Sequence, residues 1–540
     1  PPRSTLFPYT TLFRSVRAPT TDMDTAMAQS PVLKRPDVRL GLRALVIALA
    51  AIGAQGVAAQ TVRITPSVQT QLTWTDNVEA SRDKSSDWVA EVSPGIAISR
   101  ASGRVSGSLN AQFRNMGHAQ QTERNTSYLA LSGRGQIEAV ERMLFLDVDA
   151  NISRNNLSVF NGRAQNDEFN VSKDNETRTW SLKPRFEYAL GDARGSIAYT
   201  ARWLESGGSA ISTQRLEQWA AQLSDSNAGG LFGWGVNYSR IDTESDDSLS
   251  RSASQQTGRA TLFINVSPQV RLRAIGGYES NDYDGSGREE GAIYGAGVDW
   301  NPTSRTTLSA TVEDRIFGRG YDFTFKHRFA RAAWDLGYNR DYSSSLQELG
   351  DNPARLQAEA ICLAIIGATD IPSPGPLLDF YDQCLAVQGF SRLGARGFVS
   401  NSTYLSESWR VGVSLNGVRN TLSFSLQQSD RTRLSALSGL SAEDDFAQTT
   451  RIKTTTATLS YSHSLSGFSS LNSSLSRSRS TGDDASGLET LRWIASMGLT
   501  TRLGPRTTAG LNYRYQRADG AGRENDFTEN AVTANLGMTF

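Results

Sequence analysis

Few side chains in this chain of 540 residues have the types and spacing that catalysis or metal binding requires. Its three histidines, His118, His327 and His463, are far apart in the sequence and form no pair at metal-ligand spacing. We find no nucleophile elbow and no glycine-rich phosphate loop. We therefore expect no enzyme activity, no cofactor and no metal site, and the alternative is a hydrolase whose base is one of these histidines.

Acidic pairs and cysteines are the remaining groups that could do chemistry. The acidic pairs could bind Ca²⁺, but we interpret them as solvated loop charge: Asp246–Asp247, Asp444–Asp445 and Asp483–Asp484. Two cysteines, Cys362 and Cys384, are too few for a cysteine framework or a cysteine-rich metal site. In an oxidising compartment we expect them to form a disulfide that closes a loop of about 20 residues.

The elements that would position these groups are strands, and the last strand shows their pattern best. Every second residue near the C-terminus is apolar, and the positions between are small or polar: Val532, Ala534, Leu536, Met538 and Phe540. This alternation predicts a strand with one apolar and one polar face. In a transmembrane β-barrel, lipid covers the apolar face, and the last strand pairs with the first. The alternative is the last strand of a soluble sandwich.

The C-terminus also resembles the signal by which outer-membrane barrels are recognised for insertion. That signal alternates apolar positions and ends in phenylalanine, and here Leu536, Met538 and Phe540 match it. The resemblance implies that the barrel-insertion machinery is a partner of this chain.

Two kinds of connector alternate along the chain after Thr61. Tight ones are expected at 101–103, 140–142, 191–193, 226–230, 267–269, 301–304, 416–417 and 503–505. Longer polar ones are expected at 75–86, 117–125, 157–174, 205–213, 243–253, 282–289, 431–448, 480–487 and 519–528. Short turns on one rim and long loops on the other are typical of outer-membrane barrels. The pattern predicts an all-β, large antiparallel transmembrane β-barrel of about 22 strands (range about 18–24), with short periplasmic turns, long extracellular loops and both termini on the periplasmic side.

Charged residues inside the predicted strands alternate with apolar ones. Because a charge facing lipid is costly, we expect a water-filled lumen and assign these residues to it: Glu313, Arg315, Lys326, Arg328, Asp335 and Arg514. His327 is interpreted as a lumen or interface residue. Prolines inside predicted strands should mark bulges or strand ends, because proline cannot donate to a ladder: Pro66, Pro94 and Pro184.

Composition and the N-terminal region indicate the cellular compartment in which the protein functions. Lysine plus arginine equals aspartate plus glutamate, at 55 each, so no basic field for nucleic acid is indicated. Residues 5–15 resemble a translated sequencing adapter, and we expect residues 1–22 to be non-native. Residues 23–59 read as a signal peptide, with a basic region, a short apolar run and a cleavage site after Ala59. We expect an exported Gram-negative outer-membrane protein with residues 60–540 forming the barrel, in contact with membrane lipid and lipopolysaccharide.

The connector at 344–406 is much longer than the others, and long connectors often carry function. A barrel of about 22 strands has a wide lumen that known barrels plug. No segment of plug size lies between Gln60 and the first predicted strand, which argues against a TonB-dependent receptor. We therefore expect inward loops, chiefly 344–406, to occlude the lumen, and the alternative is a surface loop stapled against proteolysis.

Two stretches resemble a known group. LTWTDNV (72–78) with VSPGIAIS (92–99) resembles the opening of putative outer-membrane porins, and 299–343 is similar to outer-membrane proteins associated with the PEP-CTERM/exosortase system. The signals in 299–343 are a W-x-P-x-x-R turn, R-x-F-G, H-R and a final Y-x-R-D. The resemblance implies an outer-membrane barrel in a bacterium that makes exopolysaccharide, with that polymer or its export proteins as partners. It supplies no catalytic residues and no substrate.

Four functions are compatible with these patterns. The leading hypothesis is a porin-like channel or conduit, tied to export of exopolysaccharide or PEP-CTERM proteins. The second is a non-conducting scaffold barrel of an envelope export system. The third is a secreted β-solenoid or adhesin, and the fourth is a barrel-embedded hydrolase.

Overall fold

The computed structural model describes residues 62–100, 103–154, 158–160, 176–207, 212–225, 230–246, 252–283, 287–350, 399–435, 440–521 and 526–540. The chain divides into two compact units, residues 1–59 and 60–540, and the described residues all belong to the second. The predicted signal peptide, the residues predicted to be non-native, and Cys362 and Cys384 with their predicted disulfide lie outside the described residues.

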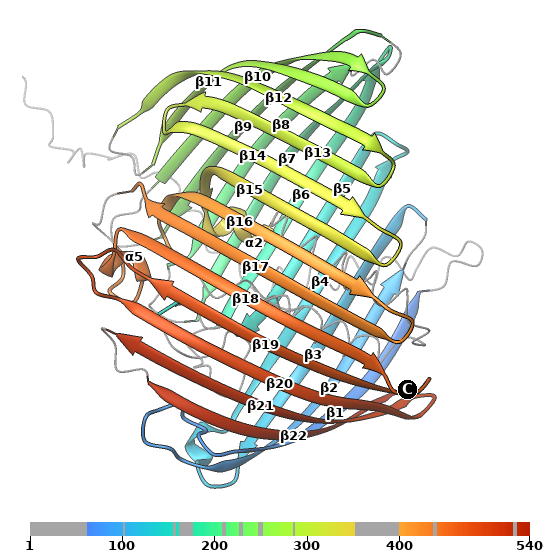
Figure 1. Ribbon diagram of the computed structural model, residues 1–540, viewed down its shortest axis with the longest axis vertical. Helices are drawn as coiled ribbons and strands as arrows, with labels where there is room; N and C mark the ends of the chain where they lie inside the picture. Colours follow the sequence, from blue (N-terminus) through green and yellow to red (C-terminus); the bar gives the residue numbers. More distant parts are fainter. Residues whose placement is uncertain are drawn as a thin grey trace, which may run out of the picture. The chain divides into compact units, whose positions relative to one another are not determined.

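The second unit is a single antiparallel sheet of 22 strands that closes on itself (Figure 1). The first eleven strands are β1 (Arg63–Thr75), β2 (Asp87–Arg100), β3 (Val105–His118), β4 (Thr126–Val140), β5 (Leu144–Arg154), β6 (Glu176–Leu190), β7 (Ala193–Ser206), β8 (Gln214–Asp225), β9 (Phe232–Ser245), β10 (Ser252–Ser267) and β11 (Val270–Asp282). The other eleven are β12 (Glu289–Thr303), β13 (Thr306–Arg315), β14 (Gly318–Arg328), β15 (Ala332–Ser344), β16 (Thr403–Asn416), β17 (Asn420–Arg433), β18 (Arg451–Ser464), β19 (Ser469–Thr481), β20 (Glu489–Gly504), β21 (Thr507–Ala521) and β22 (Phe527–Thr539). Within the described connectors, three short helical segments occur: η1 (Thr122–Arg124), α2 (Ser345–Gly350) and α5 (Asp445–Gln448).

Closure comes from pairing between the first and last strands. Ser67 of β1 lies opposite Thr539 of β22, and the ladder continues to Thr75 opposite Ala531. Side chains reinforce this seam, because the hydroxyl oxygens of Thr73 and Thr533 are 3.0 Å apart and share a hydrogen bond. The prediction of a closed barrel with about 22 strands is confirmed.

The apolar faces of the strands point away from the lumen and stay exposed. Large apolar side chains on this outer face include Leu262, Tyr294, Val312, Phe424, Leu459, Leu475, Leu499 and Leu511. A soluble protein rarely leaves so many contiguous apolar side chains uncovered. A closed antiparallel barrel with such a belt is one of the two structures that can span a bilayer with all backbone groups paired. The protein is a β-barrel of the Gram-negative outer membrane.

The connectors alternate between a short-turn rim and a long-loop rim, as predicted. The turn between β6 and β7 shows how a short turn is made: Leu190 pairs with Ala193, and Gly191 between them has φ +62°. Glycine adopts this backbone conformation without steric cost. One connector on the long-loop rim breaks the alternation, since β13 and β14 are joined by only Ile316 and Phe317. Among the described residues, no helix has the length and apolarity needed to cross a membrane.

The prolines depart from expectation. Pro66 lies near the start of β1, as predicted. The prediction of a bulge or strand end is wrong for Pro94 and Pro184, which lie inside β2 and β6. Pairing between β2 and β3 stops after Val92 and resumes at Gly95 in the same register, and β6 and β7 behave similarly around Pro184. A long ladder tolerates a gap of two residues because the strand stays paired on its other side.

Candidate functional site

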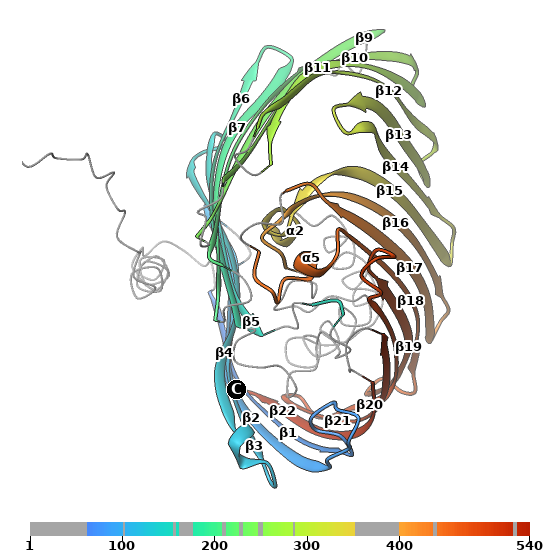
Figure 2. The ribbon, with the colours of Figure 1, turned by 90° about the vertical axis from the view of Figure 1, so that its left-hand side faces the viewer.

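Parts of the long loops fold back between the barrel walls. Figure 2 shows α2 and α5 enclosed by the ring of strands. We use the name inner layer for four described pieces of these loops: 158–160, 345–350 (α2), 399–402 and 445–448 (α5). Two of the pieces belong to the predicted loop 344–406, and the other two come from the connectors after β5 and β17.

Helix α2 is attached to the wall by one apolar side chain. Leu346 is fully buried against Leu204 of β7 and Leu216 of β8, which are 0% and 1% exposed, and against Val399. Neighbouring positions on the outer face of the same strands are exposed, for example Trp219. Leu204 and Leu216 therefore point into the lumen, where water would meet them if α2 were not in place.

Polar contacts hold the same helix at two further points. Arg202 Nη1 on β7 donates a hydrogen bond of 2.9 Å to the carbonyl oxygen of Leu346. Arg431 of β17 forms an ion pair with Glu348, with Nη2 and Oε2 3.0 Å apart, and its guanidinium lies over the ring of Tyr404. The helix is thus tied both to β7 and to β17.

The Asp444–Asp445 pair joins three pieces of the inner layer. Asp444 caps α5 by accepting a hydrogen bond from the Phe446 amide, 2.9 Å away. Its Oδ2 accepts two more, from Ser400 Oγ at 2.8 Å and from the Asn401 amide at 3.0 Å.

Asp445 binds a different loop. Its Oδ1 accepts a hydrogen bond of 2.6 Å from Ser158 Oγ, and its Oδ2 accepts one of 2.8 Å from the Val159 amide. Both carboxylates are buried, so the interpretation of Asp444–Asp445 as solvated loop charge is wrong. Because buried carboxylates need hydrogen-bond partners, the pair works as a fixed anchor for segments distant in sequence.

An apolar cluster surrounds this anchor. It brings together side chains from three loops and two strands: Phe160, Tyr404, Phe446, Ile452 and Leu488. Thr490 Oγ1 on β20 also donates a hydrogen bond of 3.0 Å to the carbonyl oxygen of Phe160. Burial of apolar side chains inside a water-filled barrel stabilises the inward position of the loops.

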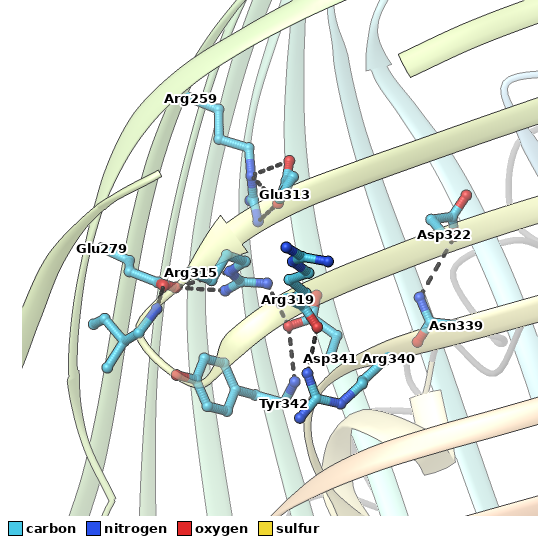
Figure 3. Close-up of polar contacts among 11 residues, drawn as sticks. Arg259, Glu279, Glu313, Arg315, Arg319, Asp322, Asn339, Arg340, Asp341 and Tyr342 are labelled. Carbon is cyan, nitrogen blue, oxygen red and sulfur yellow. Dashed lines mark hydrogen bonds and ion pairs between the residues drawn. The ribbon is translucent and has the colours of Figure 1, made fainter. Parts of the chain in front are cut away.

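The lumen face of β10 to β16 carries paired charges (Figure 3). Arg259 and Glu313 form a bidentate pair, with the closest nitrogen and oxygen 3.0 Å apart. Arg315 contacts Glu279 at 2.6 Å and Asp341 at 2.5 Å, and both Arg315 and Glu279 side chains are almost fully buried. Both arginines therefore have acidic partners, and their charges are balanced within the wall.

The six residues predicted to face the lumen lie opposite the exposed apolar positions of their strands. Glu313 and Arg315 are in the pairs just described, and Asp335 lies 3.4 Å from Arg410. Arg514 is 3.1 Å from Glu529, which is buried at the seam. Lys326 and Arg328 are exposed near the short-turn rim, and Lys326 is opposite Asp335 in the register. The structure thus distributes these six residues around the wall and does not gather them into one site.

A second sector of the lumen wall is lined with hydroxyl groups. Serine and threonine side chains on the inner face of β18, β19 and β20 make cross-strand hydrogen bonds: Thr454–Ser480, Thr456–Ser478, Thr458–Ser476 and Ser474–Ser496. Neutral hydroxyl groups dominate this sector along the middle of the barrel, with one arginine beside them, since Arg492 of β20 lies opposite Ser478 in the register.

A polar pocket lies at the long-loop rim, between the wall around β8 to β11 and the 399–402 piece of the inner layer. It contains about 360 Å³ of space, part of which is open solvent. Ten of its twelve lining residues are serine, threonine, asparagine or glutamine, and the other two are Ala253 and Tyr283. Burial is the main cause that raises the pKa of the Tyr283 hydroxyl, and the neighbouring Tyr342 raises it further, so the Tyr283 hydroxyl stays uncharged.

The three histidines do not meet. His118 ends β3 on the long-loop rim, whereas His327 lies near the short-turn rim among aromatic rings of the outer face, with Phe329 at a centroid distance of 4.1 Å. His463 lies near the short-turn end of β18 and contacts Asn420. Within the described ranges, no group of three or more His, Cys, Asp or Glu side chains is placed to hold a metal ion.

The predicted insertion signal lies at the end of β22. Leu536, Met538 and Phe540 are all exposed on the outer face. Their role in insertion stays a prediction.

Residues of the inner layer were not among the predicted site residues. Phe160, Leu346 and Phe446 lie in connectors that contain several other apolar residues, and the sequence does not distinguish them from these. An aspartate that directly precedes a short helix with a phenylalanine in its first turn was the one local signal of a capped, buried turn at 444–446.

Comparison with known proteins gives structural matches only. No protein-family model matches the chain, and no curated protein matches it. The siderophore receptor PirA from Pseudomonas aeruginosa matches with 9% identity, a TM-score of 0.43 and coverage of 90% of this chain and 81% of that chain. A mutant of the ferric enterobactin receptor PfeA from the same organism, in complex with enterobactin, matches with 11% identity, a TM-score of 0.46 and coverage of 90% and 82%. The siderophore receptor PirA from Acinetobacter baumannii matches with 9% identity, a TM-score of 0.45 and coverage of 90% and 81%.

Proposed function

We propose that this protein is a transport barrel of the outer membrane whose lumen the inner layer closes at the long-loop rim and opens when it detaches. The observation that carries the proposal is the seating of Leu346 on Leu204 and Leu216, two apolar side chains that point into the lumen. Apolar positions inside a water-filled barrel are unfavourable unless another element covers them. The presence of Leu204 and Leu216 on the lumen face therefore indicates a binding site in the wall for a segment that closes the lumen.

The chemistry of the wall suggests uncharged, polar cargo. Several arginines between β10 and β16 are paired with carboxylates, as in the Arg259–Glu313 pair, which balances much of the charge in that sector. The hydroxyl sector on β18 to β20 offers many neutral hydrogen-bond donors and acceptors, as in the Thr456–Ser478 pair. An uncharged solute with many hydroxyl groups could exchange hydrogen bonds along such a wall, and it would need no ion pair to do so.

The association with exopolysaccharide or PEP-CTERM export is a finer proposal. It is supported by the resemblance of 72–78, 92–99 and 299–343, and by a hydroxyl-rich lumen sector suited to a polyhydroxylated chain. On this proposal, the polymer or its export proteins, lipopolysaccharide and the insertion machinery are the partners. We also propose that the protein is not an enzyme, because its three histidines lie at separate places in the wall.

Conductance in planar bilayers tests the transport proposal. The substitution Leu346→Asp places a charge in the apolar seat of α2 and should release the helix. The matched control is Leu465→Asp, because Leu465 is exposed in the short turn between β18 and β19, away from the inner layer. We expect rare openings in the wild type and the control, and frequent or sustained openings in Leu346→Asp.

A scaffold that conducts nothing predicts a different result. If folded Leu346→Asp protein gives no current steps in any of the reconstituted membranes, the lumen is not a conduit and the transport proposal is wrong. Folding is verified independently by heat-modifiable mobility on gels, so an unfolded variant cannot imitate this result.

A further inference from the structure

Among the described residues, the pocket at the long-loop rim is lined by side chains that carry no charge. Its twelve lining residues include no Asp, Glu, Lys, Arg or His. A bound ion would therefore lose its hydration without gaining a charge partner, and an apolar ligand would meet almost only polar atoms. The lining fits a neutral ligand that is rich in hydroxyl groups.

Two buried hydroxyl groups of the pocket have no hydrogen-bond partner among the described residues. Ser402 is 2% exposed and Ser435 is 6% exposed, and neither Oγ atom is satisfied within the structure. Buried polar side chains are usually hydrogen-bonded, because an unsatisfied one is destabilising. Two unsatisfied hydroxyls in one pocket point to a ligand that supplies the missing hydrogen bonds.

The pocket is also built from fixed parts. Asn401, next to Ser402, is held by its amide on Asp444 Oδ2 and by a hydrogen bond of 2.6 Å from its Nδ2 to Ser212 Oγ. Gln214 of β8 donates to the carbonyl oxygen of Ser400 at 3.2 Å. These contacts position the hydroxyls before any ligand arrives, which lowers the entropic cost of binding.

We propose that this pocket binds the edge of one neutral sugar unit, with Ser402 and Ser435 donating to and accepting from its hydroxyl groups. The rest of the sugar extends into the lumen, because the pocket is small. The inference concerns binding alone, so it stands whether or not the barrel conducts. The sugar is either a free monosaccharide or a unit of a glycan chain.

Saturation-transfer NMR on the full chain in lipid nanodiscs tests the proposal, because glycoside detergents would compete for the site. The probes are glucose, galactose, mannose and N-acetylglucosamine, their linear trisaccharides, and glucuronate and glucosamine as charged counterparts. We expect saturable binding of at least one neutral probe, with a dissociation constant of about 1 mM or weaker, and no saturable signal from the charged ones. Binding of monosaccharide alone assigns the site to a free sugar, and tighter binding of its trisaccharide assigns it to a chain.

Variants separate a binding role from a structural one. Ser402→Ala with Ser435→Ala should weaken binding about tenfold, because two neutral hydrogen bonds are lost. The same change should leave the melting temperature unchanged or raise it, since it removes two unsatisfied hydroxyls. The matched control is Ser429→Ala, because Ser429 is 7% exposed with an unsatisfied hydroxyl and lies outside the pocket lining. It should change stability similarly and leave binding intact.

Three results would overturn the proposal. One is the absence of saturable signal from every neutral probe at 50-fold excess over protein. Another is binding of a neutral probe that the double variant retains at full strength. The third is a lower melting temperature of the double variant with unchanged binding, which would make the hydroxyls structural.

Discussion

Asp445 is the point at which the inner layer can be loosened by the smallest change. Its carboxylate accepts hydrogen bonds from Ser158 Oγ at 2.6 Å and from the Val159 amide at 2.8 Å. A hydrogen bond to a charged group contributes about 1.5–3 kcal/mol. Loss of both in Asp445→Ala removes at least about 3 kcal/mol from the attachment of segment 158–160, a factor of about 100 in its detached fraction.

Hydrogen exchange measured by mass spectrometry reports this change directly. The Val159 amide should exchange about 100-fold faster in Asp445→Ala than in the wild type. Asp445→Asn keeps one acceptor oxygen and should give an intermediate rate. The control is Asp484→Ala, since Asp484 is an exposed acidic residue of another loop on the same rim.

The reasoning fails if Asp445→Ala and Asp484→Ala have the same exchange rate at Val159. It also fails if the faster exchange extends to the strands of the barrel, because Asp445 would then support the whole fold and not the inner layer. With local loosening alone, the open probability in planar bilayers should rise along with the exchange rate.

Three other perturbations test separate parts of the structure. Glu529 is buried at the seam and accepts a hydrogen bond from Thr75 Oγ1 at 2.8 Å and one from Arg514. Glu529→Gln should therefore destabilise the barrel by about 3–5 kcal/mol. On gels, the variant should lose its folded mobility at a lower temperature than the control Glu141→Gln, which changes an exposed turn. Leu459→Arg on the outer face should lower the free energy of unfolding by about 2–4 kcal/mol, measured by reversible unfolding from vesicles. Ser460→Arg on the lumen face should lower it clearly less, and equal losses would argue against lipid contact. Hydrogen bonds from the Thr450 amide and hydroxyl hold the pKa of Asp483 below its usual value. The contact is therefore stable above the unfolded pKa of about 4 and weakens as the pH falls below it. Protection of the Thr450 amide from hydrogen exchange, corrected for the intrinsic rate, should be constant from pH 5 to 7 and decrease below pH 4, and Asp483→Asn should abolish this pH dependence.

The fold was predictable because each strand repeats one local rule. Alternation along 530–540 places Leu536 and Met538 on one face, and the same period of two recurs in every hairpin. Turn residues mark where the strands end, as Gly191 does between β6 and β7. Such signals depend on neighbours in sequence, so they survive without any knowledge of tertiary contacts.

The inner layer was not predictable in detail because its contacts are distant in sequence. Ser158 and Asp445 are 287 positions apart, and no periodicity connects them. Loops with scattered apolar residues have the same kind of sequence whether they extend into solvent or fold inwards. The prediction that 344–406 turns inwards came from the lumen width, and its described ends, 345–350 and 399–402, do lie in the inner layer.

The central claim is that lipid covers the outer face of every strand while the alternate face belongs to the lumen. Spin labels at Leu475 and Ser474, adjacent positions near the middle of β19, test it in liposomes, in a background with Cys362→Ser and Cys384→Ser. We expect the label at Leu475 to be more accessible to oxygen than to a water-soluble nickel chelate, and the label at Ser474 to show the opposite preference. If both labels prefer the nickel chelate, or if the label at Leu475 is inaccessible to both reagents as in a protein core, the account is contradicted.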